Sequence, residues 1–296
     1  MLLRVRGNGV QSPEILVTGA TGTVGRHVVG ALSRSGVPVR ASCRRPGALG
    51  ALSGVEPVPA DLERPQTLRR ALEGAATLFL STPLEERMID RALNVVEEAR
   101  RAGVAHVVRL SAFGAGRDGA NTLGRVHRSV ETGIEASGMA WTMLRPNSFM
   151  QNYVAFAGPT IAREGAIHMP QGEGAVSMVD ARDVADAAVA ALLEPGHHGA
   201  AYELTGPQAL SNGEVAEILS AALGRSVRYV DVAESATREA LSAAGLGPWL
   251  TGIIMELYAM SKTGEASQVI PDLADVLRRS PTTFARFAAD HREAFA

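Results

Sequence analysis

Three glycines in the segment Thr18–Gly25 constrain the fold more than any other feature of the sequence. They occupy every third position, follow the short apolar run Ile15–Val17, and precede a stretch with apolar residues at helical spacing. This pattern predicts a tight turn from a buried strand into a helix, where backbone amides approach a pyrophosphate at the helix N-terminus. An empty strand-to-helix turn is the alternative. The surrounding strand–helix–strand pattern favours the nucleotide.

Apolar strands alternate with amphipathic helices in the first half of the chain. After Ile15–Val17, the expected strands are Val37–Cys43, Val55–Val58, Thr77–Ser81, Val104–Leu110 and Ala140–Leu144. Strands that are apolar throughout indicate a parallel sheet covered by helices on both faces. We therefore expect an α/β fold with a doubly wound Rossmann sheet and a smaller, mostly helical C-terminal part that binds substrate. The expected division is 1–14 as an extension, 15–150 as the nucleotide-binding domain, and 151–296 as the rest of the sheet plus the C-terminal part.

The end of the second expected strand favours NADP(H) over NAD(H). An acidic residue there suits the adenosine ribose of NAD, whereas an arginine suits a 2′-phosphate. The sequence has Arg44 and Arg45 and no acid at this point, and a guanidinium matches a phosphate in shape and charge. Solvated arginines at a strand end are the alternative. Asp61 and Leu62, after the third strand, would lie beside the adenine, or Asp61 would cap a helix.

Composition excludes several classes of protein. With 29 basic and 31 acidic residues the formal charge is −2, which argues against binding to nucleic acid or to a membrane surface. No run of about eighteen apolar residues predicts a membrane-spanning helix. The one cysteine, Cys43, has no partner for a disulfide or a metal site, so we expect no metal and a reducing, cytoplasmic setting.

Five segments together resemble one family, the NmrA-like branch of the atypical short-chain dehydrogenases/reductases, and within it the bacterial NAD(P)H:quinone or azo-compound reductases. The segments are Thr18–Gly25, Ala60–Leu62, Arg109–Ala112, Trp141–Asn147 and Tyr202–Pro207. The resemblance implies an NADP(H) site lined by Gly19, Thr21, Gly22, Thr23, Val24, Gly25, Arg44, Asp61, Leu62, Ser81, Thr82, Leu110 or Ser111, and Pro146. It implies that Phe113, Asn147, Phe149 and Met150 lie on the substrate side. For Phe149 and Met150, a place in the core is an equal alternative.

The helix expected at Leu123–Ser137 departs from the pattern of the superfamily. Standard members carry a Tyr-x-x-x-Lys pair there, in which the tyrosine gives a proton to the substrate carbonyl. This helix has neither residue and offers His127 and Glu131 instead, one turn apart, a pair also found in the quinone-reductase group. A proton relay from His127, oriented by Glu131, is one interpretation, and a structural ion pair is the other. Tyr258 and Lys262 have the same spacing but lie over a hundred residues later, which favours coincidence.

Three functions fit this sequence. The first is an NADPH-dependent reductase that transfers a hydride to a quinone or a conjugated or polycyclic carbonyl compound, which develops a delocalised anion and needs less help from a strong acid. The second is a non-catalytic sensor of the NADP(H) pool, and the third is an epimerase or dehydratase of secondary metabolism with bound NADP. We expect a small aromatic or quinone-like partner, and the sequence leaves open whether the chain forms a homodimer.

Overall fold

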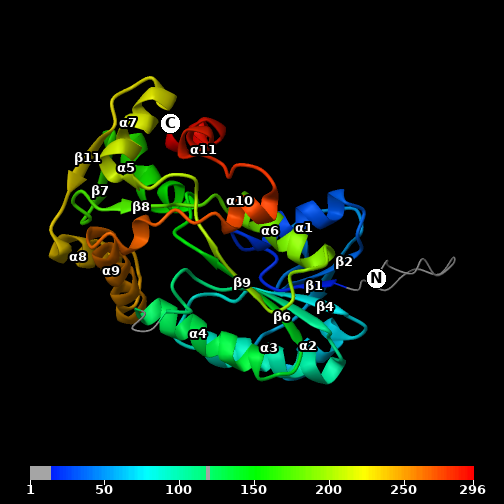
Figure 1. The fold of residues 1–296 in the computed structure, drawn as a ribbon. Coiled ribbons are helices and arrows are strands. Elements are labelled where there is room, and N and C mark those ends of the chain that lie inside the picture. Colours follow the sequence, from blue (N-terminus) through cyan, green and yellow to red (C-terminus); the bar gives the residue numbers. More distant parts are fainter. Residues whose placement is uncertain (1–14, 118–120) are drawn as a thin grey trace.

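A computed structural model describes residues 15–117 and 121–296, and its centre is a seven-stranded sheet (Figure 1). The strand order is β3-β2-β1-β4-β5-β6-β9, and every neighbouring pair is parallel. The strands are β1 (Ile15–Val17), β2 (Val39–Cys43), β3 (Val55–Pro59), β4 (Thr77–Leu80), β5 (His106–Leu110), β6 (Ala140–Pro146) and β9 (Ala200–Leu204). The order runs outward from β1 in both directions, so the predicted doubly wound fold is confirmed.

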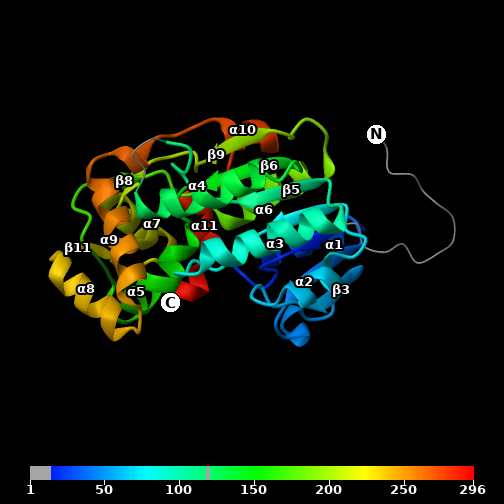
Figure 2. The same ribbon diagram turned by 90° about the horizontal axis from the view of Figure 1, so that it is seen from below.

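Helices cover both faces of the sheet, as Figure 2 shows from below. One face carries α1 (Gly25–Arg34), α6 (Ala181–Leu193) and α10 (Asp272–Leu277), and the other carries α2 (Pro65–Leu72), α3 (Met88–Ala102) and α4 (Thr122–Glu135). Alternate strand residues point into the two cores: Ile15 and Val17 belong to one, and Leu16 to the other. Burial on both sides explains why these strands are apolar throughout.

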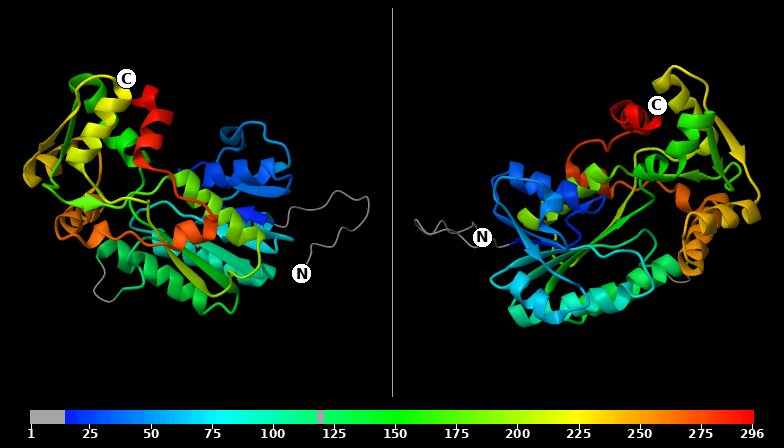
Figure 3. Two further views of the ribbon diagram at one scale, coloured as in Figure 1. Left: turned by 45° about the horizontal axis from the view of Figure 1, so that its top comes forward. Right: turned by 180° about the vertical axis from the view of Figure 1, so that it is seen from behind.

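The remaining elements gather beyond one end of the sheet strands, around a third apolar core (Figure 3). The helices are the π-helix η2 (Tyr153–Ala157), α5 (Gly158–Glu164), α7 (Asn212–Leu223), α8 (Glu234–Ala243), α9 (Pro248–Lys262) and α11 (Phe284–Asp290). The strands are β7 (Ala166–Met169) with β11 (Arg228–Asp231), and β8 (Ala175–Val176) with β10 (Leu210–Ser211). The short 3-10 helices η3 (Glu265–Ser267) and η4 (Arg292–Phe295) belong to the same part, whereas η1 (Pro46–Leu49) lies beside β3 in the sheet layers.

The chain returns to the sheet after residue 150. Strand β9 and helices α6 and α10 all belong to the sheet layers, although they follow that boundary in the sequence. The sheet layers and the C-terminal part therefore interleave along the chain, and the expected extension 1–14 lies outside the described residues. In the part of the chain that the structure describes, no helix is long and apolar enough to cross a membrane.

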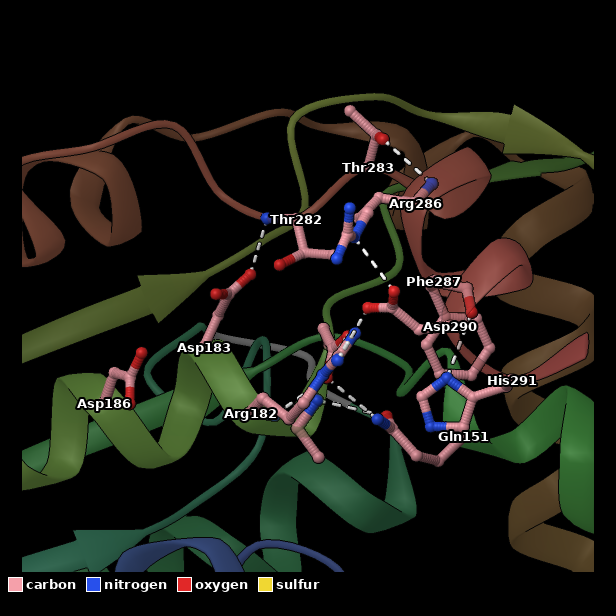
Figure 4. Close-up of polar contacts among 12 residues, drawn as sticks. Gln151, Arg182, Asp183, Asp186, Thr282, Thr283, Arg286, Phe287, Asp290 and His291 are labelled. Carbon is pink, nitrogen blue, oxygen red and sulfur yellow. Dashed lines mark hydrogen bonds and ion pairs between the residues drawn. The ribbon is translucent and has the colours of Figure 1, made fainter. Parts of the chain in front are cut away.

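An ionic network fastens the C-terminal segment to the start of α6 (Figure 4). Asp180 is fully buried, caps α6, and accepts hydrogen bonds from the guanidinium of Arg182 at 2.6 and 2.9 Å. The same guanidinium reaches Asp290 of α11 at 2.8 Å. Asp183 accepts a hydrogen bond from the backbone N–H of Thr282 at 2.6 Å. These bonds hold α11 against the layer that contains α1.

Candidate dinucleotide and substrate site

The turn between β1 and α1 is tied to the neighbouring strand by Thr18. Its hydroxyl donates to the carbonyl oxygen of Ser81 at 2.9 Å and accepts from the backbone N–H of Ser81 at 2.9 Å. Gly19 has a φ of +61°, which favours glycine, and its carbonyl accepts from the Gly22 N–H at 2.8 Å. The turn is thus fixed beside the end of β4, where Ser81 and Thr82 follow.

Only glycine fits at the start of α1. A Cβ atom on Gly25 would lie 2.1 Å from the carbonyl oxygen of Gly19, and one on Gly22 would lie 3.1 Å from the same oxygen. The helix N-terminus has no side-chain cap and no acidic residue in its first turn. Thr21 and Thr23 are exposed beside it, whereas Val24 packs in the core. Uncapped amides at the positive end of a helix dipole suit a pyrophosphate.

The region where the adenosine end of the cofactor is expected carries exposed positive charge. Arg44 and Arg45 are exposed directly after β2. Asp61 accepts a hydrogen bond from the Glu63 N–H at 3.0 Å, so its side chain stabilises the local turn before α2 and does not cap that helix. Leu62 packs against the core beneath α2 and α3.

These residues fit a phosphorylated dinucleotide. The turn Thr18–Gly25, here called the glycine cradle, opens α1 with uncapped amides that suit a pyrophosphate, and Arg44 is an exposed guanidinium directly after β2, where an arginine can accommodate a 2′-phosphate. Thr82 follows β4, which lies between β1 and β5 in the sheet. Its hydroxyl is buried and has no hydrogen-bond partner among the described residues. A buried hydroxyl without a partner is unusual in a native protein and suits a ligand group that would complete it.

Glu131 of α4 is the centre of a buried polar network. It is fully buried and accepts hydrogen bonds from Ser111 at 2.6 Å, from Arg145 at 2.8 and 2.9 Å, and from Arg128 at 3.2 Å. Burial alone would raise the pKa of Glu131, but the hydrogen bonds from Arg145 and Ser111 outweigh it and lower the pKa. The carboxylate therefore ties α4 to the ends of β5 and β6.

The expected pairing of Glu131 with His127 does not form. The carboxylate has other partners, and the imidazole Nδ1 of His127 is buried with no hydrogen-bond partner among the described residues. Burial, and next the positive charge of Arg109, hold the pKa of His127 well below its usual value. Glu131 thus neither orients the imidazole nor raises its proton affinity. A catalytic role of either residue stays a prediction.

The residues expected on the substrate side have different surroundings. Phe113 is 7% exposed, and the guanidinium of Arg117 lies 4.5 Å from its ring centre. The Asn147 amide donates to Ser177 and to the carbonyl of Ala266, both at 2.9 Å, so it joins β6 to the C-terminal part.

Two further substrate-side expectations concern aromatic and sulfur side chains near the end of β6. Met150 is 2% exposed within the third core, which supports the core alternative for this residue. Phe149 packs partly buried against the core of α1 and α6. Pro146, the last residue of β6, is buried, and its carbonyl accepts from the Phe113 N–H at 2.9 Å.

The later Tyr-x-x-x-Lys spacing lies within α9. Tyr258 packs partly buried against the third core, and Lys262 forms an ion pair with Glu234 of α8 at 3.0 Å. The two side chains thus serve packing and a helix–helix contact, as expected for a coincidental spacing.

Sequence reasoning missed the arginines of this region. Arg145 lies in the Leu-Arg-Pro-Asn segment that carries the resemblance, but no role followed from the letters alone. Arg109, on β5, is fully buried, and burial lowers its pKa to about 10. An arginine within a mostly apolar strand, beside Val107, Val108 and Leu110, was the available signal.

The fold and the glycine cradle together define a dinucleotide-binding Rossmann protein. The model of the NmrA-like family matches residues 11–288, so the chain belongs to the NmrA-like family. The family resemblance seen in the sequence is thereby confirmed.

Relatives with named activities match almost the whole chain. It is 40% identical over 283 residues to an NAD(P)H azoreductase of Xenophilus azovorans, across 95% of this chain and 99% of that protein. It is 38% identical over 289 residues to a (4-alkanoyl-5-oxo-2,5-dihydrofuran-3-yl)methyl phosphate reductase of Streptomyces griseus, with the same coverage. The NADPH-dependent quinone oxidoreductase of Escherichia coli, solved with NADPH, superimposes with a TM-score of 0.84 at 27% identity, over 93% of this chain and 99% of that one.

Proposed function

We propose that this protein is an NADPH-dependent reductase that transfers a hydride to a quinone-like or conjugated carbonyl acceptor. The observation that carries this proposal is identity along almost the full chain to two named reductases, 40% and 38%. A neighbour of the same fold is a quinone oxidoreductase solved with NADPH. The glycine cradle supports the same cofactor on independent grounds.

Each part of the site has a task in this reaction. Bound NADPH supplies the hydride. The amides that open α1 hold its pyrophosphate, and Arg44 selects the 2′-phosphate. Ser81, Thr82, Ser111 and Pro146, at the carboxyl ends of β4, β5 and β6, form the wall against which the nicotinamide is oriented. The protein mainly positions the two reactants, because the hydride chemistry belongs to the cofactor.

The acceptor class follows from what the site lacks. Among the described residues, α4 carries no tyrosine or lysine that could protonate an isolated ketone. A quinone or a conjugated carbonyl spreads the negative charge that arrives with the hydride, so one hydrogen-bond donor and water suffice to complete the product. The unsaturated lactone in the name of the Streptomyces relative is a conjugated carbonyl of this kind.

Turnover with a panel of acceptors tests the proposal. Purified protein is mixed with NADPH and, in turn, with quinones, azo dyes, unsaturated lactones and polycyclic ketones, and loss of NADPH absorbance is followed. NADPH binding is measured separately by its fluorescence. We expect turnover with at least one class. A flat trace with every acceptor, despite NADPH binding, would reject the reductase.

The two other functions predict different results. A sensor would prefer one redox form of the nucleotide and change its assembly or partner affinity without turnover. An epimerase or dehydratase would retain NADP tightly through purification. No specific feature of the described residues favours either over the reductase.

We further propose a reducing, cytoplasmic setting, a homodimeric assembly, and no nucleic-acid partner. The single cysteine, Cys43, is buried and free, which suits a reducing compartment. The formal charge of −2 supports the third point. Cell fractionation, sedimentation velocity and a salt-dependent DNA-binding assay test the three in turn.

A further inference from the structure

Two side chains, one on β5 and one on α4, have buried polar atoms without hydrogen-bond partners among the described residues. Arg109 of β5 is fully buried, and its guanidinium makes one hydrogen bond, from Nη1 to the carbonyl of Leu80 at 3.1 Å. Its Nε and Nη2 groups, and Nδ1 of His127, have no hydrogen-bond partner among the described residues. The Arg109 charge also lowers the pKa of His127, so the two groups lie within electrostatic reach of each other.

Other charged groups around α4 have partners of their own. Glu131 is held by Ser111, Arg145 and Arg128. The other charged side chains on α4 and on the elements packed against it have partners as follows: Arg125 with Thr122, Arg128 with Glu135, Arg145 with Glu203, Glu256 with Thr122, Lys262 with Glu234, Arg91 with Glu63, Glu97 with Arg100, and Glu98 with Arg69 and Arg101. Asp90 of α3 is exposed. Among the described residues, Arg109 is the charged group that acts on the imidazole.

Helix geometry places His127 nearer the carboxyl edge of the sheet than Glu131. Glu131 bonds to Ser111, the residue directly after β5. Four residues of an α-helix rise about 6 Å, and α4 starts at that edge because it follows β5. His127 therefore lies about one turn closer to the place where open α/β sheets bind their ligands.

A guanidinium fixes which ring nitrogen carries the proton. Arginine can only donate hydrogen bonds. Arg109 and Nδ1 of His127 do not bond to each other directly, because Nδ1 has no hydrogen-bond partner among the described residues. The positive charge of the guanidinium still favours the tautomer that turns a lone pair, and not an N–H, toward it. With Nδ1, the buried ring nitrogen, on that side, the proton of the neutral imidazole sits on Nε2.

We propose that Arg109 is a positioning residue that holds His127 as a neutral imidazole with its proton on Nε2, from where it donates a hydrogen bond to the carbonyl oxygen of the acceptor. This inference rests on the proposed reductase function. A neutral imidazole is an effective hydrogen-bond donor toward a developing oxyanion.

The electrons and protons balance without proton transfer from His127. NADPH is oxidised to NADP⁺ as its hydride forms a new bond to the acceptor, which becomes an oxyanion. Nε2–H stabilises that oxyanion by a hydrogen bond and keeps its own proton. One proton from water then completes the reduced product, so the imidazole needs no reprotonation between turnovers.

Nitrogen NMR on the native protein tests the protonation state directly. The His127 resonance is assigned by its loss in His127→Gln. We expect the neutral Nε2–H tautomer from about pH 6 to 8, a range in which an ordinary histidine, with a pKa of about 6.5, passes through half protonation. In Arg109→Met the pKa of His127 should rise, because the neighbouring charge is gone, whereas Arg109→Lys should keep it low. An Nδ1–H tautomer in the native protein, or an imidazolium at neutral pH, overturns the proposal.

Activity of two variants separates a hydrogen-bond donor from an acid. Gln keeps an N–H close to the position of Nε2, and Leu does not. We expect kcat to fall about 100-fold in His127→Leu and by less than about tenfold in His127→Gln, as for loss or retention of an oxyanion donor, with NADPH affinity unchanged in both. Equal loss in the two variants contradicts the donor role. Absence of turnover in the native protein would instead refute the reductase and leave the NMR result standing.

Discussion

Replacing Glu131 by Gln probes the element that joins α4 to the sheet. Gln keeps the size of the side chain and one acceptor oxygen but removes the charge that faces Arg145 and Arg128. Glu135, one turn further along α4, receives two hydrogen bonds from the same Arg128 but is partly exposed, with a side-chain exposure of 31% against 0% for Glu131. Glu135→Gln is therefore a matched control.

The expected loss of stability in Glu131→Gln follows from the burial of the Glu131 carboxylate. Removing one partner of a buried ion pair costs about 3–5 kcal/mol, and the retained oxygen of Gln favours the lower end. An exposed pair contributes about 0.5 kcal/mol. At about 2 °C per kcal/mol for a chain of this size, Glu131→Gln should lower the melting temperature by about 6 °C and Glu135→Gln by about 1 °C.

Urea and thermal unfolding at several pH values measure this difference. The folded pKa of Glu131 is lower than the unfolded value of about 4.5, so its contribution is present above that value and is lost as pH falls through the folded pKa. The gap between native protein and Glu131→Gln should stay constant from neutral pH down to about 5 and narrow below 4.5. A Glu131→Gln variant no less stable than Glu135→Gln would refute the reasoning.

Three further predictions concern the cofactor turn, cofactor choice and acid stability. Gly25→Ala should weaken NADPH binding at least about 100-fold, because its Cβ would lie 2.1 Å from the Gly19 carbonyl oxygen and force the turn open. The control Gly30→Ala, whose Cβ meets only the flexible end of Arg34 at 3.4 Å, should leave binding unchanged and raise stability by up to about 1 kcal/mol. Titration calorimetry and unfolding compare the two variants, and equal NADPH affinities would contradict the role of the glycine cradle. Arg44→Asp should shift preference from NADP(H) toward NAD(H), measured as the ratio of the two dissociation constants, and an unchanged ratio would remove Arg44 from the 2′-phosphate site. Burial lowers the pKa of His106 to about 4. The contribution of His106 to the free energy of unfolding should therefore be full above about pH 6.5 and fall by about 3 kcal/mol on acidification to pH 4. His106→Gln should flatten this decline, whereas His168→Gln, at an exposed position, should not.

The sequence predicts the sheet well because burial on both faces leaves a strong signal. Apolar runs place β1 through β6 within a few residues, and the helix expected at Leu123–Ser137 corresponds to α4 (Thr122–Glu135). Short or irregular elements carry no such pattern: β8 and β10 have two residues each, and a π-helix opens the segment that leads to α5. Such elements depend on tertiary contacts and not on a local pattern.

The site is less predictable because its charges come from separate strands. Glycines at fixed spacing report a backbone shape, so the cofactor turn is readable from neighbouring letters. The partner of a buried charge cannot be read from neighbouring letters in this way. Glu131 and His127 lie one turn apart on α4, yet Glu131 bonds to Ser111 after β5 and Arg145 of β6, and His127 is influenced by Arg109 of β5.

In the proposed reductase, that arrangement takes the place of a lysine on α4. In the superfamily pattern that the sequence resembles, a helix lysine brings positive charge beside the acid. Here a carboxylate stands one turn after His127, and arginines on β5 and β6 bring the charge from the sheet side. Arg145 is paired with Glu131, so the positive charge that acts on the imidazole is that of Arg109. A strand guanidinium held by the Leu80 carbonyl cannot follow the substrate, so it acts by fixing the state of His127 before the acceptor arrives.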